Sequence, residues 1–299
     1  MGRLGLLMVL VAGCYRPHTE ADVPCSPDGS CPTGQTCTAG RCVLDGTQVL
    51  DAPADTPDAP GDASVDAPDA MNDATSDATS DAMPRFITWK ATTTQNIPSA
   101  TAATSVTVGQ PTCASGDVEV AAIAMGNTGA STVPTFTEPA GWTLVRRSDH
   151  GSDTALLVYW HTAGAIEPST YTWQFSAAIE GVAWISCYAN VDPVAPIDVE
   201  LGTLILNTGP TYATPSITTT VANAMVVATY ASHVSVTPTT WSAPAGTSVR
   251  ANLNNGTTRS GLGIDEPVAA AGPTGALAAT ASVVQNYALV HVLALKPAP

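Results

Sequence analysis

One short stretch of the chain contains the residue types of a hydrolytic triad. The sequence SDHGSD, residues 148–153, combines serine, histidine and aspartate within six positions. A triad is defined by the geometry of its members in space, and neighbours within one turn do not acquire that geometry by being adjacent. The stretch is more typical of a solvated hairpin loop, so we predict no catalytic residue here.

Two pairs of carboxylates could in principle do the acid and base work of a glycosidase. They are Asp117 with Glu119 and Asp198 with Glu200, and each pair alternates with branched apolar residues. Such alternation is typical of the wet face of a half-buried sheet. We therefore expect solvated carboxylates and regard a glycan-active enzyme as the least favoured function.

Histidine spacing gives no indication of a metal centre. The chain has five histidines, at His18, His150, His161, His233 and His291. No two of them have the close spacing typical of zinc ligands. We predict neither a metal nor another cofactor.

Three aromatic residues alternate along one expected strand, in STYTWQFS at 169–176. Tyr171, Trp173 and Phe175 share a face there and could form a platform on which a sugar ring stacks. The alternative is that the same three rings pack between two sheets as core. Burial of the rings would distinguish the two interpretations.

The seven cysteines fall into three groups: Cys14 alone, a cluster, and a distant pair. Cys25, Cys31, Cys37 and Cys42 lie within 18 residues, a segment too small to fold on apolar burial alone, so we predict two disulfides of undetermined pairing. Four thiolates binding zinc are the alternative. Cys113 and Cys187 are expected to form a third disulfide, with two free buried thiols as the alternative.

The amino terminus explains the odd cysteine. Residues 1–13 contain one arginine and a short apolar run, which is too short to span a bilayer and is typical of a signal peptide. Val11-Ala12-Gly13-Cys14 resembles a bacterial lipobox. This resemblance implies export, cleavage before Cys14, and attachment to a membrane by acyl chains on that cysteine. An ordinary signal peptide with an incidental cysteine is the alternative. Tyr15, where an aspartate would favour inner-membrane retention, implies the outer membrane by analogy.

The acidity of the chain is local. The net charge is −15, and ten of the 25 acidic residues lie between Asp45 and Asp81, where there is no lysine or arginine. A segment of aspartate, alanine, proline, serine and threonine cannot offset its ordering entropy by burial. We predict that residues 14–44 form a lipidated cysteine-rich module and residues 45–85 a disordered stalk. Basic residues are scattered, so nucleic acid is not an expected partner.

Residues 86–299 form the predicted folded domain. Short runs rich in threonine and valine alternate with glycine, proline and asparagine, including Asn255-Gly256, which is a hairpin signal. No stretch has sustained helical periodicity with caps. The apolar run at 275–295 contains five polar residues, which favours two strands joined near Gln285-Asn286 over a membrane helix. The domain is predicted to be an all-β sandwich.

The domain also repeats itself at an offset of about 105 residues. EPAGWTLVR at 138–146 parallels APAGTSVR at 243–250, so that Pro139 matches Pro244 and Gly141 matches Gly246. The repeat predicts one jelly-roll-like sandwich built from two similar halves, or two tandem immunoglobulin-like sandwiches as the alternative.

The order of fragments over roughly residues 100–297 resembles a secreted β-sandwich domain of bacterial surface proteins and phage tail proteins. The fragments are GDVEVAAI, EPAGWTLVRR, LLVYWHTAGAIEPSTYTWQFS, YANVDPVAPID, APAGTSVR and LALKP. The resemblance implies a jelly-roll-like fold in an extracellular setting and carries no activity. The sequence therefore favours a lipid-anchored binding or adhesion module, whose ligand is a polysaccharide or another surface protein. A structural envelope protein without a ligand is the alternative.

Overall fold

The computed structural model describes residues 26, 31, 35–38, 41–44, 85–127, 134–206, 209–233 and 238–299. The chain divides into two units, Met1–Ser76 and Asp77–Pro299. The predicted lipidation site Cys14, the module residue Cys25 and the predicted stalk as far as residue 84 lie outside the described residues.

The first unit contains a small antiparallel hairpin. Strand β1 (Gln35–Thr38) pairs with β2 (Arg41–Leu44), and the register places Cys37 opposite Cys42. Cys31 and Cys37 are both disulfide-bonded. For these two cysteines, the disulfide prediction is confirmed over the zinc alternative.

The second unit is built from antiparallel strands, and its described residues contain no α-helix. Its first half has one large sheet with the strand order β3-β9-β5-β8-β7, while β4 and β6 pair with β9 outside this path. The bounds are β3 (Thr88–Ile97), the short 3-10 helix η1 (Ser99–Thr101), β4 (Ala103–Gly109), β5 (Val118–Asn127), β6 (Phe136–Thr137), β7 (Thr143–His150), β8 (Thr154–Thr162) and β9 (Thr170–Ala189).

The second half repeats this topology. Its large sheet has the order β10-β19-β13-β16-β15. The small sheet β11-β18-β14 takes the place of the pairings that β4 and β6 make with β9, and β12-β17 is an additional two-stranded sheet. The bounds are β10 (Ile197–Leu206), β11 (Thr211–Ala213), β12 (Thr218–Thr219), β13 (Ala224–His233), β14 (Trp241–Ser242), β15 (Ser248–Asn254), β16 (Arg259–Val268), β17 (Gly272–Pro273), β18 (Ala278–Ala281) and β19 (Tyr287–Leu295).

The repeated PAG motif forms the same turn in both halves. The Trp142 amide donates to the Pro139 carbonyl, and the Thr247 amide donates to the Pro244 carbonyl. The third residue of each turn is a glycine with positive φ, 86° at Gly141 and 88° at Gly246. A type II turn requires this left-handed conformation at that position, which explains why the motif keeps its glycine.

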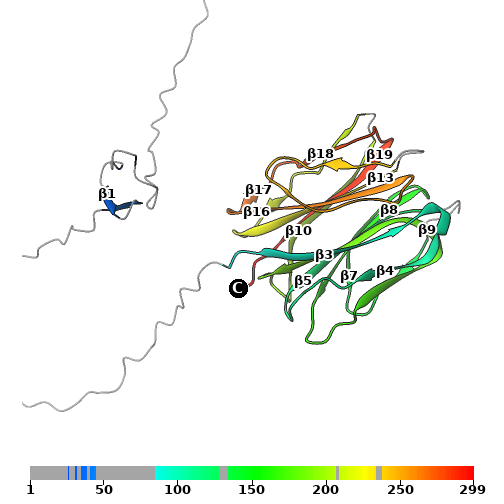
Figure 1. Ribbon diagram of the computed structural model, residues 1–299, viewed down its shortest axis with the longest axis horizontal. Helices are drawn as coiled ribbons and strands as arrows, with labels where there is room; N and C mark the ends of the chain where they lie inside the picture. The colour runs from blue at the N-terminus through cyan, green and yellow to red at the C-terminus, as the bar shows by residue number, and fades with distance from the viewer. Residues whose placement is uncertain are drawn as a thin grey trace, which may run out of the picture. The chain divides into compact units, whose positions relative to one another are not determined.

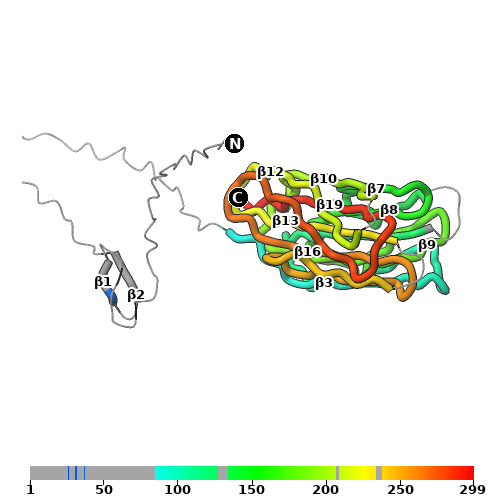
Figure 2. Tube along the Cα trace, turned by 90° about the horizontal axis from the view of Figure 1, so that it is seen from above, coloured from blue at the N-terminus to red at the C-terminus, as the bar shows by residue number. Residues whose placement is uncertain are grey.

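The second unit has three apolar cores, and one of them joins the two halves. One lies inside the first half, between the large sheet and the layer of β4, β6 and the first part of β9; a second lies inside the second half. The third contains side chains from both large sheets, which pack face to face. Figure 1 and Figure 2 show the strands of the second half, yellow to red, lying alongside those of the first, cyan to green.

The all-β sandwich predicted from the sequence, with two similar halves, is confirmed. Each half has a core of its own, as in the tandem alternative, and the two also share one, as in a single body. At the shared core, Trp184 of β9 packs on Gly261 and Gly263 of β16, where an added Cβ would lie 2.8 Å and 2.7 Å from the indole. The glycines therefore shape the second sheet to fit the first.

Strand β9 is longer than the sequence predicts. The runs at 169–176 and 182–191 read as two strands, whereas β9 continues through both layers of the first half. Its first part pairs with β4 and its second part with β3. The strand changes layers near Gly181, where a Cβ would lie 2.2 Å from the Ala124 carbonyl oxygen. Glycine is needed there because the two backbones approach so closely.

The carboxyl-terminal apolar run forms two strands, as predicted. Strands β18 and β19 flank Gln285, and the side chain of Gln285 is buried with bonds to Ser232 and Thr239. In the part of the chain that the structure describes, no helix is both long and apolar enough to cross a bilayer.

Candidate functional site

The aromatic residues proposed as a sugar platform lie in the first-half core. Tyr171, Trp173 and Phe175 are only 3%, 0% and 6% exposed. The Trp142 ring lies edge-on to Tyr171 and Trp173, with centroid distances of 5.0 Å and 5.2 Å. None of the three rings has a face open to solvent, so burial favours the core-packing alternative.

The prediction of a solvated carboxylate pair at Asp117 and Glu119 is wrong. Asp117 is 7% exposed and Glu119 is 0% exposed. Strand β5 lies between β9 and β8 in the large sheet, and both of its faces are covered by cores. The alternation of carboxylate and valine thus does not mark a wet face here.

Glu119 is the most unusual polar residue of the domain. Neither of its carboxylate oxygens has a hydrogen-bond partner among the described residues. Burial raises the pKa of Glu119 to about 7, although nearby His161 and the Tyr171 hydroxyl oppose the shift. A carboxyl group in such a place is neutral over much of the acidic range because burial penalises its charged form.

A second carboxylate, Glu167, lies close to Glu119 and is well bonded. It accepts hydrogen bonds from the Tyr171 hydroxyl at 2.6 Å, from Nε2 of His161 at 3.0 Å and from the Gly164 amide. These bonds lower the pKa of Glu167 despite partial burial. The loop between β8 and β9 is therefore fastened by Glu167 to the edge of the first-half core.

The SDHGSD stretch forms a β7–β8 hairpin, but it is not only a solvated loop. Asp153 accepts from Nη2 of Arg259 at 2.9 Å and lies 3.1 Å from Nδ1 of His233. The Tyr287 hydroxyl also donates to Asp153. Arg259 is 4% exposed and donates further to Glu180 at 3.2 Å. The stretch thus joins the two halves rather than forming a triad.

The two members of the second carboxylate pair, Asp198 and Glu200, bind different residues. Glu200 accepts two hydrogen bonds from Arg146, at 2.7 Å and 2.8 Å, and one from Nε2 of His291 at 3.0 Å. The bonds from His291 and Arg146 lower the pKa of Glu200 to about 2. Asp198 instead accepts from the amide and the hydroxyl of Thr220. The two carboxylates therefore do not act together as an acid–base pair.

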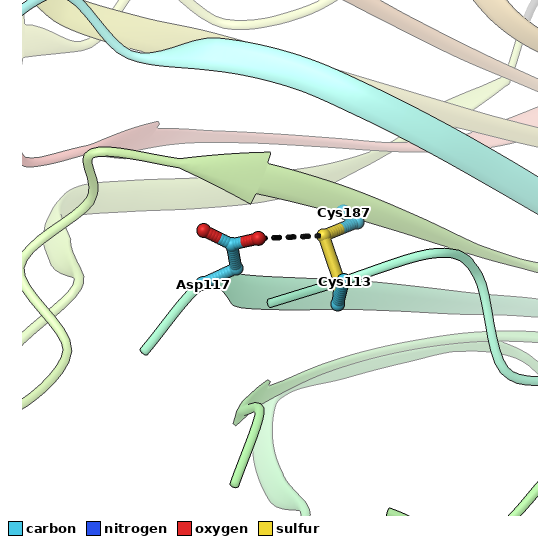
Figure 3. A group of neighbouring side chains, drawn as sticks. All are labelled: Cys113, Asp117 and Cys187. Atoms are coloured by element: carbon cyan, nitrogen blue, oxygen red, sulfur yellow. Dashed lines mark hydrogen bonds between the residues drawn. A yellow bond between two sulfur atoms is a disulfide. The ribbon is translucent and has the colours of Figure 1, made fainter. Parts of the chain in front are cut away.

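Cys113 and Cys187 form the predicted disulfide. Their sulfurs lie beside Oδ2 of Asp117, which is 3.8 Å from the sulfur of Cys187 (Figure 3). A disulfide sulfur has no proton to donate, so this approach is a contact only. Metal ligation by cysteine needs a thiolate, and both thiols are used in the S–S bond, so this group is not a metal site.

A groove in the first half is the clearest place for a ligand. Its volume is about 530 Å³, and it lies where the free edges of β3 and β4 face each other. The Thr93 hydroxyl donates to the Gly109 carbonyl across this gap. The lining is free of charged side chains and consists of Gln95, Asn96, Ile97, Pro98, Thr101, Ala103, Ser105, Val106, Thr107, Gly109 and Thr170.

Comparison with family models, with curated proteins and with solved structures gives no match. The assignment of a function therefore depends on the groove, the buried carboxyl group and the sequence signals.

Sequence reasoning missed the groove because its residues are ordinary threonines, serines and amides. All of them except Thr170 lie on either side of Pro98, where the chain turns from β3 through η1 into β4, and this is their one shared signal. It also missed the role of Arg259, which follows the Asn255-Gly256 turn. Oδ1 of Asn255 accepts from the amides of Thr258 and Arg259, both at 2.9 Å, and so fixes where this arginine enters the interface.

Proposed function

We propose that this protein is an exported lipoprotein, anchored through Cys14 to the bacterial outer membrane, whose β domain binds a neutral glycan. The observation that carries the binding proposal is the uncharged groove between β3 and β4. Its volume falls within the range of ligand sites, about 300–1,000 Å³. Its amide and hydroxyl groups can donate and accept hydrogen bonds, as the hydroxyls of a sugar do.

The place of the groove in the domain supports presentation to an external ligand. The folded domain begins near Phe86, whose carbonyl accepts from the Asn190 side chain at 2.9 Å. The carboxyl terminus lies at the same end, because the Ala298 amide donates to the Asn190 carbonyl. The groove includes the opposite end of β3, from Gln95 to Ile97. The groove therefore lies at the end of β3 that is distant from the first residues of the folded domain.

A glycan array probed with the full chain tests the binding proposal. We expect binding to one class of neutral glycan and its loss in Thr107→Arg, which places a long charged side chain in the groove. Thr240→Arg is the matched control, because Thr240 is an exposed threonine of the second half. If Thr107→Arg still binds the glycan, the binding site is not this groove. If the wild-type protein binds no glycan on the array, the glycan proposal is wrong.

The anchor has a separate test. Cells fed a fatty-acid analogue should label the wild-type protein and leave Cys14→Ser unlabelled. Label retained by Cys14→Ser would overturn the lipobox assignment. A blank array together with a labelled anchor would favour the structural envelope protein, or a protein ligand, over the glycan-binding module.

A further inference from the structure

The two halves differ at one position of their central strands in a way that packing does not require. Glu119 lies opposite His161 on β8 and Cys187 on β9. In the second half, Val226 holds the matching place between β16 and β19 and is also fully buried. The fold therefore accepts an apolar residue at this position. A carboxyl group kept there without a hydrogen-bond partner needs another explanation, because burying it is costly.

The Tyr171 hydroxyl connects this carboxyl group to the loop above it. It donates to Glu167, and it also lies near Glu119, where it favours the charged form although it makes no hydrogen bond to Glu119 while the loop is closed. A phenol has one proton and can donate it to only one carboxylate at a time. While Glu119 is protonated, Glu167 receives that proton without competition. Once Glu119 is ionised, two anions compete for it.

We propose that Glu119, Tyr171, Glu167 and His161 form a pH-dependent latch, in which protonated Glu119 keeps the 164–168 loop closed and ionised Glu119 releases it. The loop is fixed at both ends by backbone bonds, from the Gly116 amide to the Ala163 carbonyl and from the Gln110 amide to the Ser169 carbonyl. Between these ends, Glu167 supplies the side-chain bonds that hold it.

The charges around Glu119 act in opposite directions. Glu167 from the loop and Asp117 from the turn before β5 both repel an ionised Glu119, while His161 on β8 attracts it. Lys90 of β3 is already paired with Asp117 at 3.0 Å. Tyr159 on β8 and Tyr171 on β9 stay neutral, because burial raises the pKa of each phenol. The Cys187 sulfur opposite Glu119 does not titrate, because it is in the disulfide.

The expected direction with pH follows from linkage. The pKa of Glu119 is about 7 in the closed loop, against an ordinary value of 4.5 for a glutamate. Opening that returns the group to water releases a proton, so opening becomes more favourable as the pH rises. If opening restores the ordinary pKa of a glutamate, the opening equilibrium increases about tenfold between pH 6 and pH 8.

Hydrogen exchange of the full chain, measured by mass spectrometry at pH 6 and pH 8 and corrected for intrinsic exchange rates, tests the latch. We expect peptides covering 163–169 to exchange about tenfold faster at pH 8 by the same linkage argument. In Glu119→Gln the ratio should fall to one, because an amide does not titrate. Peptides of the second half serve as the internal reference for intact folding.

Two further variants keep the test decisive. Glu119→Val places at this position the residue that the second half has, and it should also remove the pH dependence. It replaces Glu119→Gln in the test if that variant folds poorly. Glu167→Gln removes the anionic acceptor and should raise loop exchange at both pH values. A wild-type ratio within twofold of one overturns the proposal. A tenfold ratio that persists in Glu119→Gln assigns the titration to another group and overturns it equally.

Discussion

The two halves fasten the same part of the fold by different chemistry. In each, a segment precedes the central strand of the large sheet, β5 or β13. In the first half, Cys113 in that segment is bonded to Cys187 of β9. The second half has no cysteine, and its segment is held by Thr220, which donates to Asp198 of β10. The comparison indicates that the fold needs the segment fixed and accepts either a covalent bond or hydrogen bonds.

The edge strands extend this comparison. Strands β3 and β10 each have an irregularity in register at the same place, at Lys90 and at Asp198. Each of these residues binds the segment before its central strand: Lys90 pairs with Asp117, and Asp198 accepts from Thr220. The backbone irregularity is thus repeated, while the charge of the residue on it is reversed.

The largest loss of stability is expected at the buried ion pairs that join the two halves. Arg259 of the second half pairs with Glu180, a buried residue of the first, and with Asp153. Arg259→Met leaves the Glu180 carboxylate buried without its cation. Breaking a buried ion pair in this way costs about 3–5 kcal/mol, because the remaining charge has no partner. Urea unfolding followed by tryptophan fluorescence measures the change.

Arg147→Met is the matched control for Arg259. Arg147 pairs with Asp149 within the first half, and both side chains are partly exposed. Exposed pairs contribute about 0–1 kcal/mol, so this substitution should change little. If the two arginine variants lost the same stability, the interface would not depend on the buried pair.

The next effect concerns the disulfide that distinguishes the first half. Cys113 and Cys187 are 74 residues apart, so their bond restricts a long loop of the unfolded chain. Cys113→Ala with Cys187→Ala should cost about 2–4 kcal/mol of unfolding free energy, the typical range for the loss of a disulfide. Hydrogen exchange should show the first-half strands opening before those of the second. Equal loss of protection in both halves would mean that they unfold as one unit.

The sequence predicts the architecture well because its signals are local. The two PAG motifs, the Asn255-Gly256 turn and the alternating runs each specify a turn or a strand without reference to the rest of the chain. The repeat then connects them into two halves. The disulfide is suggested by parity, since six cysteines remain once Cys14 is set aside as the predicted lipidation site.

The site is predicted less well because burial depends on layers that the local pattern does not show. Glu119 alternates with valines as a solvated residue would, and its complete burial depends on segments that are distant in the sequence and pack around it. The Tyr171 ring fits a platform or a core equally well by spacing alone. The partners of Arg259 lie 79 and 106 residues away in sequence, so no local pattern indicates them.

The smallest loss of stability is expected when the hydrogen bonds between Asp198 and Thr220 of the second half are removed. Asp198→Ala removes the acceptor for the amide and hydroxyl of the exposed Thr220. A hydrogen bond to a charged group contributes roughly 1.5–3 kcal/mol when shielded, and less here, where water can replace the lost acceptor; we expect about 1 kcal/mol. Thermal unfolding measures the loss, and exchange of residues 214–223 shows where it acts. A loss of stability as large as that of the disulfide variant would show that the second half depends on Asp198 as strongly as the first half depends on its disulfide. No loss of stability would show that the β12–β17 pairing alone holds the segment.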